Sequence, residues 1–265
     1  NLIASHRDPE SYVAGSTPLH RGAFRFSGDI DIFHDREERV AQAALGDAQI
    51  LQSEGLEVVW LRREPAIYTA EIGEGLERTR LEWLVDSDFR FFPVIKDELF
   101  GYVLHPVDLA ANKVMAAAGR RKPGDVVDLI PIHEKILPLG AVVWAAVEKA
   151  PGFTPEGLIA EIRRNARYGD EELRGVPTIE PINPREFFVR LRMILDEAEE
   201  FVTRMPTDLI GLLFLKDGKI VQPDPDRLNE YTTHAGRRRG HWPTNAEISV
   251  AMFELYSKGR FDSVG

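Results

Sequence analysis

The chain has 265 residues, a formal net charge of −10, 43% hydrophobic residues and no cysteine. This size and composition are typical of an ordinary globular protein with a substantial core, built as one large domain or two small ones. The lack of cysteine excludes disulfides, structural thiolate zinc sites and thiol catalysis, and the acidic balance argues against a protein that coats nucleic acid. Because no run of eighteen apolar residues exists, we expect no membrane span. With no cysteine in the chain, a cytoplasmic location is the default expectation.

The first informative stretch covers residues 14–35. It holds Gly15-Ser16, then twelve residues, then Asp29-Ile30-Asp31-Ile32. The alternation predicts a strand on which the two aspartates share one face. Two adjacent carboxylates repel each other unless a cation lies between them, and oxygen ligands without His or Cys suit Mg²⁺. Gly15 and Ser16 offer backbone N–H groups and a hydroxyl that a phosphate could approach.

That combination resembles the nucleotidyltransferase superfamily of DNA polymerase beta-like folds. Its motif is a hydrophobic residue, Gly-Gly or Gly-Ser, a spacer, and Asp-hydrophobic-Asp, which Ala14 to Asp31 match. Within the superfamily, the run Arg25-Phe26-Ser27-Gly28-Asp29-Ile30-Asp31 resembles the AbiEii toxin-type branch. The alternative is an acidic strand end on an unrelated α/β protein.

After this motif, the pattern predicts a helix over 37–53 and two strands, 56–61 and 66–72, joined as a hairpin. A second strand pair is expected over 89–95 and 99–104, with its turn at 96–98. The expected fold is α/β (α+β): a polymerase beta-like mixed sheet flanked by helices.

The second informative block covers 105–134. Asp108 is a plausible N-cap for a helix that runs to about Gly119. Lys113 and Arg120 are seven residues apart, so they lie on nearly the same helix face. After Pro123-Gly124, the residues Asp125 and Asp128 are expected one turn apart on a second helix.

This second block resembles the AbiEii-type pattern of an inward Lys, then Arg, then Asp-X-X-Asp-Leu. The resemblance implies that Lys113 contacts nucleotide phosphates and that Asp125 supports it or the acceptor site, with Asp128 next to it. The alternative is a solvated helix face of alternating charges.

One departure concerns the third carboxylate, which the superfamily takes from a later strand as the proposed general base. The strand expected to match is 89–95, which carries Arg90 and Pro93 but no acid. Asp88 and Asp97 flank it. Either the base is absent, or the matching strand is a different one. The proline favours an edge strand.

From residue 139 onward the chain is predicted to be mainly helical. We expect helices from Thr154 to about Tyr168, from Asn183 to about Met205 and over 245–258, with a hairpin around 216–218. A soft border divides a nucleotidyltransferase core, 1–138, from a helical region, 139–265.

Two runs of basic residues are candidates for binding a nucleic-acid substrate. They are 120–122 and 237–239, the latter close to Trp242. Adjacent arginines beside an aromatic suit a phosphate backbone and a stacked base; the alternative is a surface loop paired with acids.

The resemblance implies transfer of a nucleotide from an NTP to a hydroxyl acceptor, with release of pyrophosphate. It assigns Mg²⁺ (or Mn²⁺) to Asp29 and Asp31, and phosphate or nucleotide contacts to Gly15, Ser16, Arg25, Ser27, Lys113, Arg120 and Asp128. It also implies an RNA acceptor such as tRNA and a cognate antitoxin protein, in a toxin–antitoxin or phage-defence setting. The alternatives are a small-molecule or protein acceptor, or a catalytically silent nucleotide-binding protein.

Overall fold

A computed structural model describes residues 2–20, 25–87, 89–149 and 152–238. These residues form two compact units. The first comprises 1–88, 93–105 and Arg238, and the second 89–92 and 106–237, as far as each is described. The sequence suggested a border near residue 138, whereas these units part between His105 and Pro106. Whether either unit is an independent domain stays a prediction.

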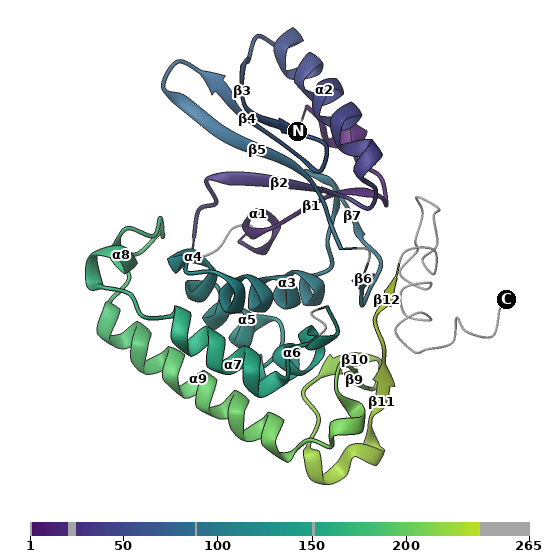
Figure 1. The fold of residues 1–265 in the computed structure, drawn as a ribbon, viewed down its shortest axis with the longest axis vertical. Coiled ribbons are helices and arrows are strands. Elements are labelled where there is room, and N and C mark those ends of the chain that lie inside the picture. Colours follow the sequence, from purple (N-terminus) through teal and green to yellow (C-terminus); the bar gives the residue numbers. More distant parts are fainter. Residues whose placement is uncertain (1, 21–24, 88, 150–151, 239–265) are drawn as a thin grey trace, which may run out of the picture. The chain divides into compact units, whose positions relative to one another are not determined.

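The first unit is built on a seven-stranded mixed sheet with the order β3-β4-β5-β2-β1-β8-β7 (Figure 1). Parallel pairing joins β2 to β5 and β1 to β8, and the remaining pairs are antiparallel. The strands are β1 (Ser11–Ala14), β2 (Asp29–His34), β3 (Glu57–Glu64), β4 (Ile67–Glu74), β5 (Glu77–Val85), β7 (Ile95–Asp97) and β8 (Gly101–Val103). The helical segments are η1 (Ala4–His6), α1 (Ser16–Leu19) and α2 (Glu37–Ser53).

One face of this sheet is covered by α2. Val40, Ala44 and Leu51 recur at helical spacing and are buried in one core cluster with Ile32 and Trp83 of the sheet. The strand with the aspartate pair, the helix 37–53 and the 56–72 hairpin are thereby confirmed. Strand β5 was not predicted.

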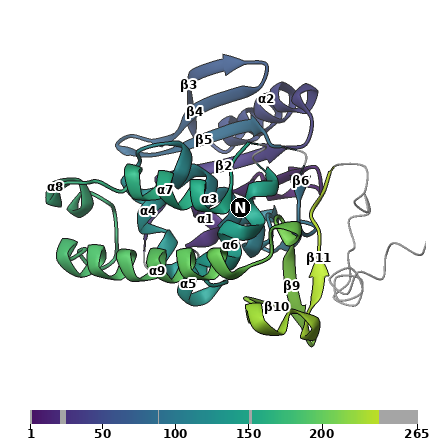
Figure 2. The same ribbon diagram turned by 60° about the horizontal axis from the view of Figure 1, so that its bottom comes forward.

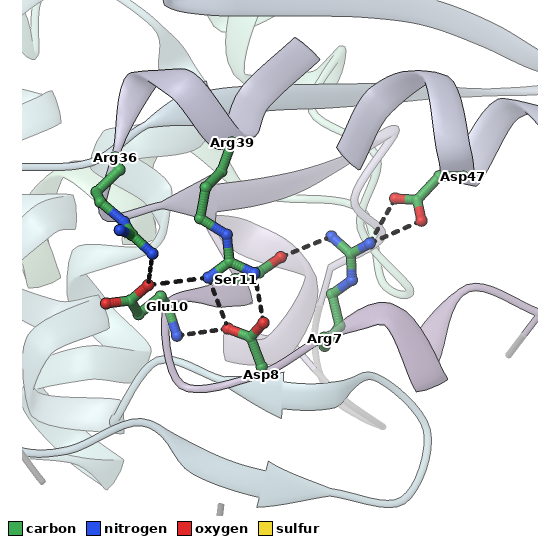
Figure 3. Close-up of polar contacts among 7 residues, drawn as sticks. All are labelled: Arg7, Asp8, Glu10, Ser11, Arg36, Arg39 and Asp47. Carbon is green, nitrogen blue, oxygen red and sulfur yellow. Dashed lines mark hydrogen bonds and ion pairs between the residues drawn. The ribbon is translucent and has the colours of Figure 1, made fainter. Parts of the chain in front are cut away.

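A buried ion pair ties the N-terminal segment to α2 (Figure 3). One terminal nitrogen of Arg7 donates to both carboxylate oxygens of Asp47, at 2.7 and 2.6 Å, and the other donates to Ser11 at 3.0 Å. Asp47 also accepts the indole N–H of Trp83 at 2.7 Å. Nearby, Arg39 pairs with Asp8 and Glu10. The Arg7 and Asp47 side chains are almost fully buried. Removing one of them would therefore leave the charge of the other in the core without this counter-charge.

The second unit is mainly helical. Its helices are α3 (Pro106–Gly119), α4 (Pro123–Val127), α5 (Leu129–Lys135), α6 (Leu139–Ala146), η2 (Val147–Lys149), α7 (Pro155–Asn165), α8 (Asp170–Arg174), α9 (Pro184–Arg204), η3 (Thr207–Leu209) and η4 (Pro225–Glu230). Helix α9 packs against α6 and α7, and α3 packs against α6 and α7 (Figure 2). The strands β9 (Leu213–Lys216), β10 (Lys219–Val221) and β11 (Thr232–His234) form a small sheet, and β6 (Phe89–Arg90) pairs with β12 (Arg237–Arg238).

Local signals predicted much of this unit. Thr154 caps α7 by accepting from the Gly157 N–H, and Asn183 caps α9. The β9–β10 turn places Asp217 and Gly218 at positive φ, as expected for a two-residue hairpin loop. The helix predicted over 245–258 lies outside the described residues. No helix in the described ranges is long and apolar enough to cross a membrane.

The prediction of one strand over 89–95 was wrong. Only Phe89 and Arg90 are strand residues at its start, and β7 begins at Ile95. Between them, the N–H groups of Phe91 and Phe92 donate to the carboxylate of Asp108, at 2.8 and 3.0 Å. These N–H groups therefore bind a side chain instead of a neighbouring strand, and Pro93 has no backbone N–H to donate.

The same contact corrects the role predicted for Asp108. Helix α3 begins at Pro106, so Asp108 is inside the first turn and does not precede the helix. Its buried carboxylate accepts the two N–H groups from the 91–92 segment and lies 3.3 Å from the Lys149 ammonium. Asp108 thus fixes the start of the helix that carries Lys113.

Candidate functional site

A carboxylate face lies on the first unit, on the sheet side opposite α2. In the parallel β2–β5 pair, Asp29 lies beside Arg80, and Asp31 beside Glu82. Paired residues project to the same face, so these four side chains share one side while Ile30 and Ile32 share the other. The predicted common face of Asp29 and Asp31 agrees with this register.

Glu82 is the acid that the sequence analysis missed. It stands next to Asp31 on the neighbouring strand, which is the geometry required of a third carboxylate from a later strand. The alternation around Glu82 does indicate a strand, because Leu81 and Trp83 are apolar and buried while Glu82 between them faces the other side. The strand was overlooked because its first four residues are all exposed and polar or charged.

The other candidates for a third carboxylate lie elsewhere. Asp97 ends β7 at the sheet edge, separated from β2 by β1 and β8, and its carboxylate accepts from the Leu99 and Phe100 N–H groups at 2.8 and 2.9 Å. It therefore stabilises the β7–β8 turn. Asp88 lies outside the described residues.

Gly15 lies against the Asp31 carboxylate. Its φ of +69° belongs to the left-handed region, and a Cβ at this position would lie 1.8 Å from Asp31 Oδ2. Both the backbone conformation and the contact therefore require glycine. The predicted Gly-Ser segment and the aspartate pair do lie together in space.

The hydroxyl groups of this loop fix the start of β2. Thr17 and Ser27 each donate to the Asp29 carbonyl oxygen at 2.7 Å. Arg25 donates to the Ser16 hydroxyl oxygen at 2.7 Å, so these two predicted phosphate ligands lie together. The Ser27 hydroxyl is bound to the backbone, which gives it a positioning role in this structure.

Arg80 lies between two of the acids. Its Nε is 3.3 Å from Asp29 Oδ1, and its Nη1 is 3.5 Å from Glu82 Oε1. The Arg80 side chain is about half exposed. A guanidinium thus partly neutralises the carboxylate face.

This face fits a divalent cation of the magnesium type. Mg²⁺ keeps several waters and takes only one or two protein carboxylates together with substrate phosphates. Within the described ranges, no three or more His, Asp or Glu side chains are grouped so that they could hold a metal ion by themselves. Asp29 and Asp31 would therefore supply part of the coordination shell, which phosphate oxygens and water would complete.

A second polar cluster lies in the second unit around Lys113. The Lys113 ammonium is 2.9 Å from Asp125 Oδ1 and 3.1 Å from Asp128 Oδ2, and all three side chains are buried. Arg120 binds the other Asp125 oxygen at 2.7 Å. Lys113 and Arg120 do converge, as their spacing predicted. Asp125 belongs to α4, whereas Asp128 lies between α4 and α5, so they are not on one helix.

The charges of this cluster depend on one another. Burial alone would raise the pKa of Asp125, but the hydrogen bond from Arg120 and the charge of Lys113 lower it below its ordinary value. Asp125 therefore stays ionised at neutral pH and holds both cations. The cluster orients the Lys113 ammonium, and the role of Asp125 at a nucleotide or acceptor site stays a prediction.

The basic run at 120–122 is largely paired with acids. Arg121 binds Glu172 at 2.7 Å and stacks over the Tyr168 ring at 4.7 Å, and Arg120 binds Asp125. Of the second run, Arg237 and Arg238 form β12, and Arg239 lies outside the described residues. The positive charge at Arg120 and Arg121 is thus partly cancelled within the second unit.

Comparison with known proteins identifies the fold. No protein-family model and no curated protein sequence matches the chain. Among solved structures, it is similar to MenT4, a nucleotidyltransferase toxin from Mycobacterium tuberculosis H37Rv, with a TM-score of 0.53 and 17% identity over 78% of this chain and 81% of that chain. The nucleotidyltransferase fold expected from the sequence is confirmed.

Proposed function

We propose that this chain is a metal-dependent nucleotidyltransferase that moves a nucleoside monophosphate from an NTP to a hydroxyl acceptor. The observation that carries the proposal is the face formed by Asp29, Asp31 and Glu82, with Gly15 packed against the Asp31 carboxylate. The toxin fold of MenT4 supports the same activity.

Asp29 and Asp31 would hold Mg²⁺ (or Mn²⁺), which supplies charge neutralisation and orientation of the triphosphate. The Gly15-Ser16 segment lies next to them and would bind the β- and γ-phosphates, with Arg25 held close through the Ser16 hydroxyl. Thr17 and Ser27 keep the first aspartate in place through its carbonyl oxygen.

In the reaction, the acceptor oxygen forms a bond to the α-phosphorus while the bond from that phosphorus to the bridging oxygen breaks. Pyrophosphate leaves with the bonding electrons. The proton of the acceptor hydroxyl passes to a carboxylate, and Glu82 is the residue we assign to this role because it stands beside Asp31.

Lys113 is proposed to neutralise phosphate charge, with Asp125, Asp128 and Arg120 as its support. The support rests on the geometry within the second unit, where two carboxylates orient the ammonium and Arg120 binds Asp125. Arg120 and Asp128 were expected as nucleotide contacts, and their ion pairs favour positioning roles.

The proposed acceptor is an RNA such as tRNA, in a toxin–antitoxin setting with a protein antitoxin. The description of MenT4 as a toxin supports the setting. The second candidate is a small-molecule acceptor. It is favoured by the pairing of Arg120 and Arg121 with acids, because this leaves less positive charge for an RNA backbone.

Thermal unfolding with Mn²⁺ or Mg²⁺ and each of the four NTPs tests the nucleotide site. A ligand that binds only the folded state raises Tm by mass action. We expect at least one metal–NTP pair to raise Tm of the wild type, and Asp31→Ala to abolish the rise. An equal rise in the variant would contradict the assignment, and Asp97→Ala serves as the control acid outside the face.

A further inference from the structure

The Arg80 guanidinium occupies the region of the carboxylate face where a cation is needed. It contacts Asp29 at 3.3 Å and Glu82 at 3.5 Å, while Asp31 stands beside Glu82 in the strand register. Three carboxylates on one face repel one another unless a cation lies close to them. Arg80 therefore acts as a counter-cation for Asp29 and Glu82 when no metal is bound.

The contacts of Arg80 are weak enough to be exchanged. Its side chain is 47% exposed, and the side chains of Asp29 and Glu82 are 27% and 23% exposed. Ion pairs that are open to solvent contribute little, and both distances are long for charge-assisted hydrogen bonds. A divalent ion can therefore displace Arg80 from Asp29 without breaking a buried network.

We propose that Arg80 couples the metal to the nucleotide: it competes with bare metal for Asp29, and it binds the triphosphate once metal and NTP arrive together. Once released, the guanidinium can donate hydrogen bonds to the phosphate oxygens of the triphosphate, because its planar fork matches their geometry. The proposal rests on the proposed nucleotidyltransferase site and adds to it a residue that favours the metal–NTP complex over the free ion.

Because Arg80 has these two roles, one substitution should change the Kd for bare Mn²⁺ and the Kd for Mn²⁺–NTP in opposite directions. Arg80→Gln removes the competing charge, so the Kd for Mn²⁺ alone should fall by about two- to fivefold. The same variant lacks a phosphate ligand, so the Kd for Mn²⁺–NTP should rise by about tenfold. A residue with a merely structural role would change both affinities in the same direction, or neither.

The chain offers a matched control. Arg78 lies two residues earlier on the same strand and the same face, but it pairs with Glu57 on β3. Arg78→Gln should leave both Kd values unchanged. Arg80→Lys keeps the charge without the planar fork, so it should retain the wild-type affinity for Mn²⁺ alone and lose part of the affinity for Mn²⁺–NTP.

The experiment is isothermal titration of the full chain with Mn²⁺, with Mn²⁺–NTP and with Mn²⁺–tripolyphosphate. Opposite shifts for Arg80→Gln, with tripolyphosphate following the NTP, support the proposal. Shifts of the same sign, no shift, or equal effects of Arg78→Gln overturn it while leaving the nucleotide site intact. If the wild type binds neither Mn²⁺ nor Mn²⁺–NTP, the proposed function fails and this inference fails with it.

Discussion

The α-carbon of Gly15 lies so close to the Asp31 carboxylate that a Cβ there would be 1.8 Å from Oδ2. We therefore expect Gly15→Ala to displace Asp31, to strain a backbone at φ +69° and to cost about 1–3 kcal/mol of stability. Nucleotide-dependent stabilisation should disappear together with this contact. Thermal unfolding with and without Mn²⁺–NTP measures both effects.

Gly28 provides the control for that experiment. A Cβ at Gly28 would meet nothing within 4 Å, although this glycine also lies in the loop before β2. Gly28→Ala should leave both stability and nucleotide binding close to the wild type. If Gly15→Ala behaves like Gly28→Ala, the close approach to Asp31 is not part of the site.

Glu82 should matter for the chemical step more than for binding. Glu82→Gln keeps the size of the side chain but removes its ability to accept a proton, so we expect a loss in kcat of about 10²- to 10⁴-fold. Measuring kcat and KM separately distinguishes this from weaker binding. Asp97→Asn, at the sheet edge, should leave kcat unchanged; equal losses in the two variants would refute the assignment of Glu82.

Removing the Lys113 side chain should lower the stability of the fold, which its sequence context did not indicate. Lys113→Met leaves the buried Asp125 and Asp128 short of a counter-charge, which should cost about 3–5 kcal/mol. Denaturant unfolding tests this expectation. A variant that is inactive but as stable as the wild type would contradict the buried cluster.

Stability and phosphate binding at Lys113 can be separated with a second substitution. Adding Asp128→Asn to Lys113→Met removes the charge of one of the two buried carboxylates that Lys113 contacts, while Asp125 keeps its pair with Arg120. We expect the double variant to recover part of the stability without recovering nucleotide transfer. Recovery of both would show that Lys113 serves the fold alone.

His34 should make stability depend on pH. Burial, together with the nearby charges of Arg7 and Arg39, lowers the pKa of His34 to about 3, while the charge of Asp8 opposes this shift. Between about 6.5 and 3 the unfolded chain binds more protons than the folded chain, so stability falls as pH falls. The loss should approach about 1.4 kcal/mol per pH unit below 6.5.

The variant His34→Leu tests this dependence. Both ring nitrogens of His34 are buried without a hydrogen-bond partner within the described residues, so an apolar side chain of similar size should be tolerated. Urea unfolding at pH 7.0, 6.0 and 5.0 should show a flatter pH profile than that of the wild type. Identical slopes would assign the dependence to other groups.

The sequence predicted those parts of the site that depend on local patterns. Strand β2 follows from its alternation, α2 from its apolar spacing, and the pairing of Gly15 with Asp31 from a motif that spans only seventeen positions of the chain. These features are set by neighbours in sequence, so they can be read without the sheet order.

The sequence missed what depends on long-range pairing. Glu82 lies on the carboxylate face because β5 pairs with β2 in parallel. Asp108 does not cap the helix because its carboxylate accepts the N–H groups of Phe91 and Phe92, seventeen and sixteen residues away. The alternation of Leu81 and Trp83 shows which way Glu82 faces, but no local signal tells which strand lies beside β2.

The most direct test of the central claim is transfer of label from α-³²P-labelled NTPs. The wild type, Asp31→Asn and Asp97→Asn are incubated with Mg²⁺, each labelled NTP, and either tRNA or a pool of small hydroxyl compounds, and pyrophosphate release is followed alongside. We expect label on one acceptor class, with equimolar pyrophosphate, for the wild type and Asp97→Asn only. Transfer by Asp31→Asn at the wild-type rate would contradict a reaction centred on the carboxylate face.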